Sequence, residues 1–180
     1  MTTWVALLRG VNVGGKHRLP MRDLVAIFGD AGCADATSYI QSGNVVFRAD
    51  RETASRVPTA VEEAVADRFG FRAPIMLRPA EELAKVAREN PFARAGEDVA
   101  TLHVAFLAGL PSADRVASLD PDRSPPDEFA VRGSHVYLRC PGGYGRTRLT
   151  SQYFDSRLAT TSTVRNWRTV LALLEMTARP

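Results

Sequence analysis

The sequence predicts an α+β protein in two halves, and two observations carry that prediction. Over residues 1–79, apolar residues recur with the periods of strands and helices in the order βαββαβ. Over residues 99–180 a second cycle of the βαββα type follows, with an additional C-terminal helix. In the split βαβ arrangement, both crossover helices cover one face of a four-stranded antiparallel sheet. We therefore expect two ferredoxin-like halves, joined by a helical connection over residues 80–98.

The elements of the first half follow from local patterns. In order, we expect a strand over residues 4–8, a helix over 21–28, strands over 37–41 and 44–47, a helix over 54–69 and a strand over 73–77. Ser42-Gly43 is a compact hairpin connection, because glycine accepts positive φ and serine bonds to its own backbone. Gly70 is expected to end the second helix. In such a unit we expect the loop after the first strand and the hairpin turn to lie at opposite ends of the sheet, unless the loop folds back.

The second half repeats the pattern with a variation at its end. We expect a strand over residues 101–107, a helix over 112–119 capped by Ser112, a hairpin of strands 128–131 and 136–138, and helices over 149–158 and 164–177. The hairpin turns at Gly133-Ser134. No strand is expected at the position of a fourth strand, where a helix capped by Thr163 is predicted instead. Trp167 lies on the apolar stripe of that helix and is expected in the core.

Composition excludes several classes of protein. The chain has 180 residues, of which 45% are hydrophobic, and its apolar runs are far shorter than the roughly twenty residues of a membrane span. Met1-Thr2-Thr3 lacks the charged start of a signal peptide, so we expect a cytoplasmic protein with no membrane partner. Cys33 and Cys140 match no redox or metal spacing. No metal or cofactor is expected.

The charge is distributed unevenly along the chain. The formal net charge is +3, but residues 130–170 carry seven arginines against the single acid Asp155, whereas residues 31–129 carry 11 basic and 16 acidic side chains. An otherwise acidic chain therefore has a basic C-terminal segment, which favours an anionic partner.

A basic glycine loop at residues 9–18 is the first candidate anion site. Its Gly10-x-x-x-x-Gly15-Lys16 spacing resembles a phosphate-binding loop, but His17 replaces the magnesium-binding hydroxyl and Pro20 intervenes before the helix. Those departures argue against a nucleotide triphosphatase. Two interpretations stay open: backbone N–H groups with Arg9, Asn12, Lys16 and Arg18 form an anion site, or the glycines only relieve the strand-to-helix connection.

Two further segments combine basic side chains with glycine or a helix start. Residues 141–148 place Arg146 and Arg148 beside Tyr144, a pattern found both in nucleic-acid contacts and in ordinary flexible loops. In the predicted last helix, Arg165 and Arg168 fall in or beside the first turn, next to Asn166, where the helix dipole disfavours cations. Either an external anion or the internal acid Asp155 could offset that cost.

Three separated motifs resemble a known family. They are Leu7-Leu8-Arg9-Gly10-Val11-Asn12-Val13-Gly14-Gly15 followed by Met21 and Leu24, then Tyr39-Ile40-Gln41-Ser42-Gly43-Asn44-Val45-Val46-Phe47, and finally Thr163-x-Arg165-Asn166-Trp167-x-Thr169-Val170. In this order they resemble the bacterial domain-of-unknown-function family 1697. The resemblance implies a compact αβ protein of two ferredoxin-like halves. It implies no activity, substrate or cofactor, and no functional residue is carried over from it.

The leading hypothesis is a cytoplasmic binding protein for an anionic small molecule or nucleic acid. Its expected ligand-binding residues are Arg9, Asn12, Lys16, Arg18, Arg146, Arg148, Arg165 and Asn166. One alternative is an enzyme acting on a small phosphorylated or carboxylated metabolite, with His17 or Tyr144 as acid–base group, although the sequence holds no catalytic signature. The other is a protein-interaction scaffold. We expect a monomer or a weak dimer.

Overall fold

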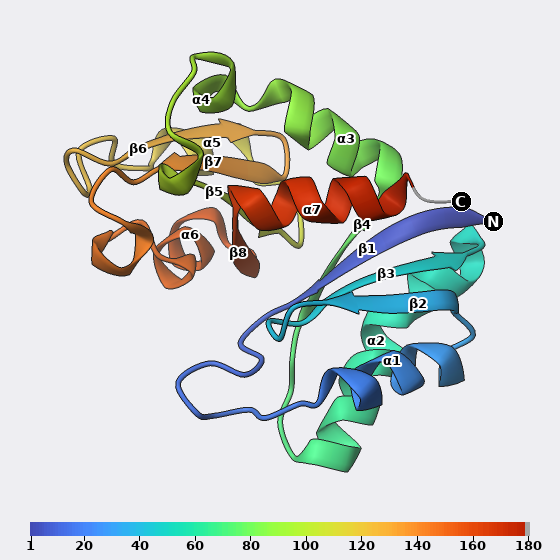
Figure 1. The fold of residues 1–180 in the computed structure, drawn as a ribbon. Helices are drawn as coiled ribbons and strands as arrows, with labels where there is room; N and C mark the ends of the chain where they lie inside the picture. Colours follow the sequence, from blue (N-terminus) through green and yellow to red (C-terminus); the bar gives the residue numbers. More distant parts are fainter. Residues whose placement is uncertain (179–180) are drawn as a thin grey trace. The chain divides into compact units, whose positions relative to one another are not determined.

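The computed structural model describes residues 1–178 and divides the chain into two compact units. Unit 1 comprises Met1–Leu83 and the described residues from Leu173 onward, and unit 2 comprises Ala84–Ala172. Each unit contains one four-stranded antiparallel sheet, so the mixed α+β class is confirmed (Figure 1). The boundaries between the units fall within α3 (Ala80–Glu89) and α7 (Trp167–Thr177). No helix formed by residues 1–178 is long and apolar enough to cross a bilayer.

Unit 1 has its strands in the order β2-β3-β1-β4. The elements are β1 (Thr2–Leu8), α1 (Met21–Asp30), β2 (Ala34–Tyr39), β3 (Asn44–Ala49), α2 (Arg51–Phe69) and β4 (Ile75–Pro79). Figure 1 shows α1 and α2 on the same face of this sheet. Phe28 of α1 and Phe47 of β3 are fully buried there, with ring centroids 5.3 Å apart. Alternation along the strands and a 3.6-residue stripe on the helices thus produce one core.

Local capping explains where α2 begins and ends. The Asp50 side chain accepts a hydrogen bond of 2.7 Å from the backbone N–H of Thr53, and this bond lowers the pKa of the Asp50 carboxyl. Gly70 follows the helix with φ of 77°, a left-handed conformation that closes the last turn by a bond to Ala66. The prediction that Gly70 ends this helix is confirmed.

Unit 2 has its strands in the order β6-β7-β5-β8. The elements are α4 (Pro91–Arg94), β5 (Leu102–Leu107), α5 (Ala113–Ala117), β6 (Glu128–Arg132), β7 (His135–Arg139), α6 (Ser151–Leu158) and β8 (Ser162–Asn166), with short 3₁₀ helices at Val99–Thr101 and Tyr144–Arg146. Ser112 caps α5 as predicted, by accepting a bond from the N–H of Arg115. The hairpin of β6 and β7 turns at Gly133-Ser134, also as predicted.

The end of unit 2 differs from the sequence prediction. β8 pairs with β5 through five residue pairs from His103↔Asn166 to Leu107↔Ser162, so the fourth strand that we expected to be absent is present. The last helix begins at Trp167 and not at Val164. Hydrogen bonding to β5 overrides the helical pattern of these residues, because strand formation depends on neighbours that are distant in the sequence.

Each unit buries one cysteine. Cys33 in unit 1 and Cys140 in unit 2 are free thiols, with exposed fractions of 8% and 0%. Burial raises the pKa of each thiol to about 11. Both side chains therefore stay protonated at neutral pH and act as small apolar groups in their cores.

Candidate anion-binding site

The glycine loop after β1 is a miniature hairpin. The N–H of Asn12 donates to the carbonyl of His17 at 3.0 Å, and the N–H of Lys16 donates to the carbonyl of Val13 at 3.0 Å. Gly14 and Gly15, with φ of 58° and 71°, occupy the two central positions. Two positive φ angles are the requirement of a tight type I′ turn, which explains the glycine pair. The loop therefore has a defined backbone that presents Lys16 directly after the turn.

Asn12 fixes this loop to the rest of unit 1. Its Oδ1 accepts a hydrogen bond of 2.8 Å from the N–H of Leu19. Its Nδ2 donates to the carbonyl of Leu19 at 2.9 Å and to the carbonyl of Gln41, in the turn between β2 and β3, at 2.6 Å. The side chain was expected to bind a ligand, but three bonds within the protein occupy it. Asn12 therefore fixes the backbone of the loop.

The expectation that this loop and the turn between β2 and β3 lie at opposite ends of the sheet is wrong. β1 runs antiparallel to β3, so the end of β1 meets the start of β3 at the Leu7↔Asn44 pair. Gly43 packs against this end so closely that a Cβ placed on it would lie 2.8 Å from the Cβ of Leu8. Its φ of 79° also favours glycine. Tight packing at Gly43 brings the two segments together.

His17 holds the other side of the loop. Its Nδ1 lies 3.0 Å from the carbonyl oxygen of Gly10, and its ring stacks on Phe71 with centroids 4.5 Å apart and planes inclined by 9°. Phe71 follows α2 and packs against the core of unit 1. The histidine that interrupts the phosphate-loop pattern thus has a structural role in anchoring the loop.

A hollow of about 370 Å³ lies between this loop and the start of α1. It is lined by Asn12, Gly15, Lys16, Arg18, Leu19, Pro20 and Gln41, a set that contains two cations and no carboxylate. Among residues 1–178, neither Lys16 nor Arg18 forms an ion pair. Pro20 supplies no side-chain cap for α1, and the first turn of this helix carries the acid Asp23, which does not line the hollow. Arg9, the remaining basic residue of the loop, is half-buried and lies outside the lining.

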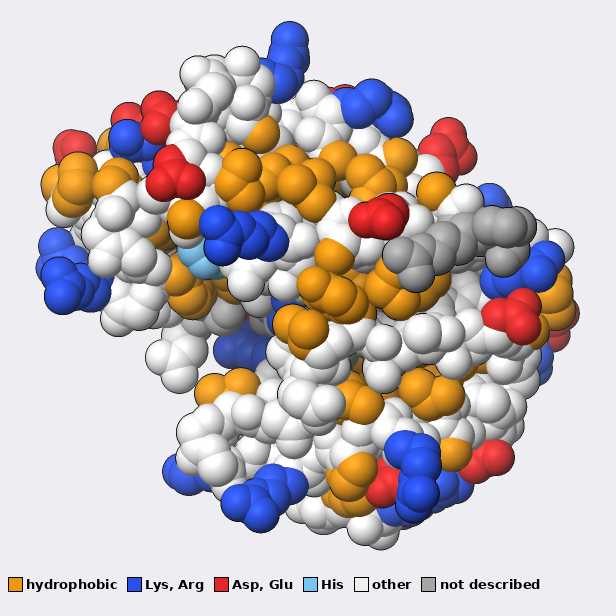
Figure 2. All heavy atoms as spheres, in the orientation of Figure 1, with side chains coloured by type: hydrophobic (Ala, Val, Ile, Leu, Met, Phe, Trp, Pro, Cys, Tyr) orange, Lys and Arg blue, Asp and Glu red, His pale blue; other side chains and the backbone are white. Residues whose placement is uncertain are grey.

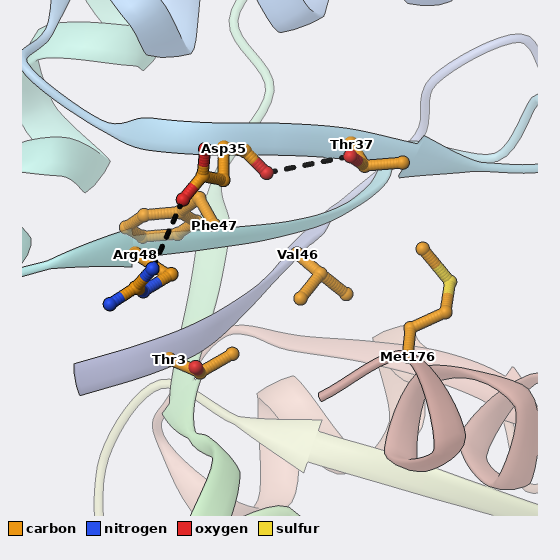
Figure 3. A pocket seen from close by; sticks show the side chains of 7 residues that line it. All are labelled: Thr3, Asp35, Thr37, Val46, Phe47, Arg48 and Met176. Atoms are coloured by element: carbon orange, nitrogen blue, oxygen red, sulfur yellow. Dashed lines mark hydrogen bonds and ion pairs between the residues drawn. The ribbon is translucent and has the colours of Figure 1, made fainter. Parts of the chain in front are cut away.

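A second hollow of unit 1 differs from the first in that its lining contains a carboxylate beside its cation. It has a volume of about 240 Å³ and is lined by Thr3, Asp35, Thr37, Val46, Phe47, Arg48 and Met176 (Figure 3). Its single cation, Arg48, pairs with Asp35 at 3.3 Å. The carboxylate neutralises the arginine, so this hollow is a poorer anion site than the hollow beside Lys16 and Arg18.

The basic residues predicted in unit 2 are arranged separately. Arg146 and Arg148 are exposed on the segment that follows β7. Tyr144 stacks on His103 with centroids 4.8 Å apart, and burial lowers the pKa of His103. The N–H of Arg148 donates to the buried hydroxyl of Ser124 at 2.9 Å, which fixes the backbone beneath these side chains.

Arg165 and Asn166 have structural partners that the sequence analysis did not foresee. Arg165 lies in β8 and not in a helical first turn, and its Nη1 donates to Thr163 Oγ1 at 2.8 Å and to the carbonyl of Val164 at 3.1 Å. Burial lowers the pKa of this guanidinium to about 10. Asn166 Oδ1 accepts a bond of 2.8 Å from the N–H of Thr169 and so caps α7. The predicted capping role of Thr163 is wrong for this reason.

A cluster of arginines that sequence analysis missed surrounds Tyr153 of α6. The guanidinium carbons of Arg123 and Arg157 lie 5.0 Å and 6.0 Å from the ring centroid, and Arg115 Nη1 donates to the Arg157 carbonyl at 3.4 Å. Tyr153 itself accepts a bond of 2.9 Å from the N–H of Asp120. These residues come from two distant segments, residues 115–123 and 153–157, so no local sequence pattern could have revealed the cluster.

Comparison with known proteins supports the fold and identifies a family. None of the curated proteins matches the chain. The conserved bacterial protein SP0830 from Streptococcus pneumoniae has a solved structure similar to this one, with a TM-score of 0.75, 24% sequence identity and 98% of each chain covered. At that identity the similarity concerns the fold alone. The family model described as "Protein of unknown function (DUF1697)" matches residues 1–137. Since the match covers most of the sequence and includes the glycine loop and the turn between β2 and β3, the chain belongs to the family DUF1697.

Proposed function

We propose that unit 1 binds a small anion bearing a phosphate group in the hollow beside Lys16 and Arg18. The observation that carries this proposal is the lining itself: two cations without an ion pair among residues 1–178, no carboxylate, and a backbone held by Asn12. Unpaired cations on a fixed scaffold bind an anion with little loss of conformational freedom in the protein backbone. Lys16 supplies a point charge, and the Arg18 guanidinium can bond two oxygens of one phosphate.

The proposal concerns a small ligand and not nucleic acid. Figure 2 shows Lys and Arg side chains in several separate groups on the face in view. A continuous basic surface is what a polyanion requires for strong electrostatic binding. The hollow of unit 1, with two cations around about 370 Å³, favours a ligand with one or two phosphate groups.

Binding is supported better than catalysis by the present geometry. His17, the acid–base candidate of the loop, is held by Gly10 and Phe71. The hollow is also open to solvent, whereas catalysis favours a site that excludes water. We therefore assign the loop a binding role.

The experiment is a titration of the full-length protein with inorganic pyrophosphate at constant ionic strength, followed by two-dimensional ¹H–¹⁵N NMR. The amide signals of Gly14–Lys16 and of the first turn of α1 are expected to shift. The double variant K16Q/R18Q is expected to lose this response, while the charge-matched variant R146Q/R148Q retains it. Equal responses of both variants, or shifts confined to unit 2, would overturn the assignment.

We further propose that each unit is a ferredoxin-like split βαβ unit. Support comes from the strand orders β2-β3-β1-β4 and β6-β7-β5-β8, in which the first strand of each unit lies at the centre beside the third and fourth. A cytoplasmic location is part of the same proposal. It is supported by the two buried free thiols, which persist in reducing compartments.

A further inference from the structure

β6 is an edge strand of the unit 2 sheet, with β7 on one side only. It pairs with β7 through five consecutive residue pairs, Glu128↔Arg139 to Arg132↔His135, without a register shift. The edge strand β2 of unit 1 differs, because its pairing is interrupted by a shift between Ala34 and Thr37. Such irregularities protect sheet edges from pairing with other chains. β6 has no such irregularity.

Two residues of β6 turn their backbone N–H and C=O groups away from β7. Cys140 bonds through its N–H to the carbonyl of Thr101, and the carbonyl of Ser134 accepts from Leu107, so even-numbered residues of this segment face β5. Bonded pairs alternate along an antiparallel ladder, so His135, Tyr137 and Arg139 face β6. Their partners are Arg132, Ala130 and Glu128. The backbone groups of Phe129 and Val131 therefore point outward.

One of these outward-pointing backbone groups, the carbonyl of Val131, accepts a hydrogen bond from a side chain. The carbonyl of Val131 accepts a hydrogen bond of 2.9 Å from Nη1 of Arg132, the exposed side chain next to it in the sequence. A bond to an exposed side chain of this kind is easily exchanged for a bond to an incoming backbone N–H.

The two faces of β6 have different surroundings. Phe129 and Val131 pack against the unit 2 core, where the rings of Phe129 and Phe154 lie 6.0 Å apart. Glu128, Ala130 and Arg132 lie on the opposite face. On that face Tyr137, the pairing partner of Ala130, donates its hydroxyl to the carbonyl of Val86 at 2.9 Å.

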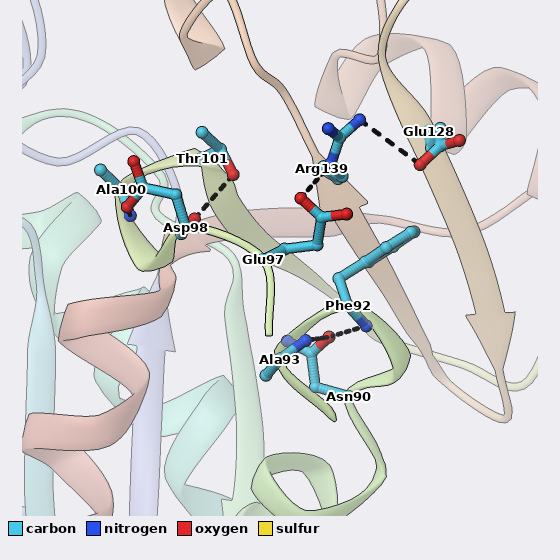
Figure 4. Close-up of polar contacts among 9 residues, drawn as sticks. All are labelled: Asn90, Phe92, Ala93, Glu97, Asp98, Ala100, Thr101, Glu128 and Arg139. Atoms are coloured by element: carbon cyan, nitrogen blue, oxygen red, sulfur yellow. Dashed lines mark hydrogen bonds and ion pairs between the residues drawn. The ribbon is translucent and has the colours of Figure 1, made fainter. Parts of the chain in front are cut away.

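A hollow of about 710 Å³ follows this edge. Consecutive residues Glu128, Phe129 and Ala130 line it, and since consecutive side chains point to opposite faces, the hollow reaches the strand edge. The segment before β6 forms another part of its wall, through Pro121, Asp122, Pro125, Pro126 and Asp127. Pro91 and Phe92 of α4 form part of its wall. Figure 4 shows Phe92 reaching from α4 toward the strands that carry Arg139 and Glu128. The small side chain of Ala130 leaves room beside Phe92 for an apolar group.

Opposite charges mark the two ends of β6. Glu128 and Arg132 are exposed on the same face, four residues apart. Glu128 lies 3.6 Å from Arg139, which also pairs with Glu97 at 2.8 Å, so this acid shares its cation with a second carboxylate (Figure 4). Oppositely charged side chains placed directly across from each other stabilise strand pairing. In an added antiparallel strand, the residue facing Arg132 comes four positions before the residue facing Glu128.

We propose that β6 is a docking edge for an extended segment of a partner protein, which adds to the sheet as an antiparallel fifth strand. The segment carries an acidic residue opposite Arg132, an apolar residue opposite Ala130 and a basic residue opposite Glu128. Backbone bonds to Phe129 and Val131 supply affinity, and the two charged pairs fix direction and register. This surface belongs to unit 2 and is independent of the anion site in unit 1.

The test uses the synthetic peptide Thr-Thr-Glu-Thr-Leu-Thr-Lys-Thr-Thr with blocked termini, titrated into the full-length ¹⁵N-labelled protein. The amide signals of Phe129 and Val131 are expected to shift and to exchange more slowly with solvent. A peptide of identical composition with Glu and Lys interchanged is expected to bind roughly tenfold more weakly, because it places like charges opposite each other at both ends. Equal binding of the two peptides would overturn the proposed register.

N-methylation of the peptide backbone provides a control that leaves the protein unchanged. Methyl groups on the two threonines that flank leucine block the N–H groups facing β6 and are expected to abolish binding. A methyl group on leucine blocks an N–H that faces solvent and is expected to preserve binding. Loss of binding in both cases, or in neither, would contradict strand addition.

Exchange of charges on the protein completes the experiment. The double variant E128K/R132E is expected to prefer the interchanged peptide, so the inversion cannot be attributed to unfolding. β6 itself reads Glu-Phe-Ala-Val-Arg and matches the proposed pattern. If sedimentation of the protein without peptide shows a dimer that protects the same amides, the edge belongs to a second copy of the chain and the partner proposal is overturned.

Discussion

Asn12 and Gln41, 29 positions apart in the sequence, are joined by a hydrogen bond of 2.6 Å from Asn12 Nδ2 to the Gln41 carbonyl. The same side chain bonds both backbone groups of Leu19. One amide therefore ties the glycine loop, the turn between β2 and β3 and the entrance to α1 into one structure. The rigidity of the proposed anion site depends on this residue.

Replacement of Asn12 by alanine removes all three bonds and leaves the backbone groups of Leu19 without them. We expect a loss of about 2–3 kcal/mol in the free energy of unfolding, measured with urea. Asn12 has φ of 54°, so part of this loss is backbone strain. The variant N12G relieves the strain and is expected to recover only about 1 kcal/mol. Complete recovery in N12G would show that the side-chain bonds contribute little.

A matched pair of glycine substitutions tests the close contact between the loop end and the hairpin. In G43A the new Cβ meets Leu8 at 2.8 Å in addition to the unfavourable φ, and we expect a loss of about 3 kcal/mol. In G133A the φ of 57° is also unfavourable, but no atom lies within 4 Å of the new Cβ, so about 1 kcal/mol is expected. Chemical denaturation of both variants gives the comparison. Similar losses would contradict the close packing at Gly43.

His103 is expected to make stability depend on pH. Burial holds the native pKa of His103 below the value of about 6.5 that the unfolded chain has, so the unfolded state binds more protons in the interval between these values. Its contribution to stability is complete above pH 6.5 and is lost as the pH falls toward the native pKa. The variant H103Q has no titrating group at this position and so lacks this pH-dependent contribution to stability. The difference in melting temperature between pH 7.5 and pH 5.5 is therefore expected to be smaller in H103Q than in the wild type. An unchanged difference would show that His103 is not responsible.

The start of α7 is tested by substitutions at Asn166. The variant N166A removes the acceptor for the N–H of Thr169, and we expect a loss of about 1 kcal/mol in the free energy of unfolding. Aspartate and serine also accept such a bond, so N166D and N166S are expected to retain most of the stability. Thermal unfolding of the three variants decides whether the helix is capped at this residue.

Tyr153 combines a hydrogen bond with a ring that lies beneath two arginines. The variant Y153F keeps the ring but loses the bond to the N–H of Asp120, for which we expect a cost of about 1 kcal/mol. Y153L also removes the aromatic surface below Arg123 and is expected to cost roughly 1 kcal/mol more. Equal losses in the two variants would assign the whole effect to the hydroxyl.

The accuracy of the sequence-based predictions depended on how local each signal was. Gly70, Ser112 and Gly133 mark a helix end, a cap and a turn through their own backbone preferences, and all three predictions are confirmed. β8 was missed because its pairing with β5 joins residues about 60 positions apart, whereas the helical pattern of residues 164–177 is local. The environment of Arg165 was mispredicted for the same reason. Its side chain is buried in β8, whereas the sequence had indicated the first turn of a helix.

In the candidate site, too, local features were predicted from the sequence and contacts between distant residues were not. The glycine pair in the loop was visible in the sequence, and so was the basic character of Lys16 and Arg18. The role of Asn12 was not visible, since an asparagine between glycines looks the same whether it bonds a ligand or a distant carbonyl. The contact with Gln41 required the antiparallel register of β1 and β3, which our expectation of opposite ends had misjudged.

The distribution of the two cysteines gives each unit its own reporter of unfolding. A protonated thiol with a pKa of about 11 reacts slowly with alkylating reagents at neutral pH, and burial excludes the reagent as well. Labelling therefore requires that the surrounding core opens. Mass spectrometry can distinguish peptides that contain Cys33 from peptides that contain Cys140. The rates of their modification in the unmodified wild-type chain would show whether the two cores open together or one after the other.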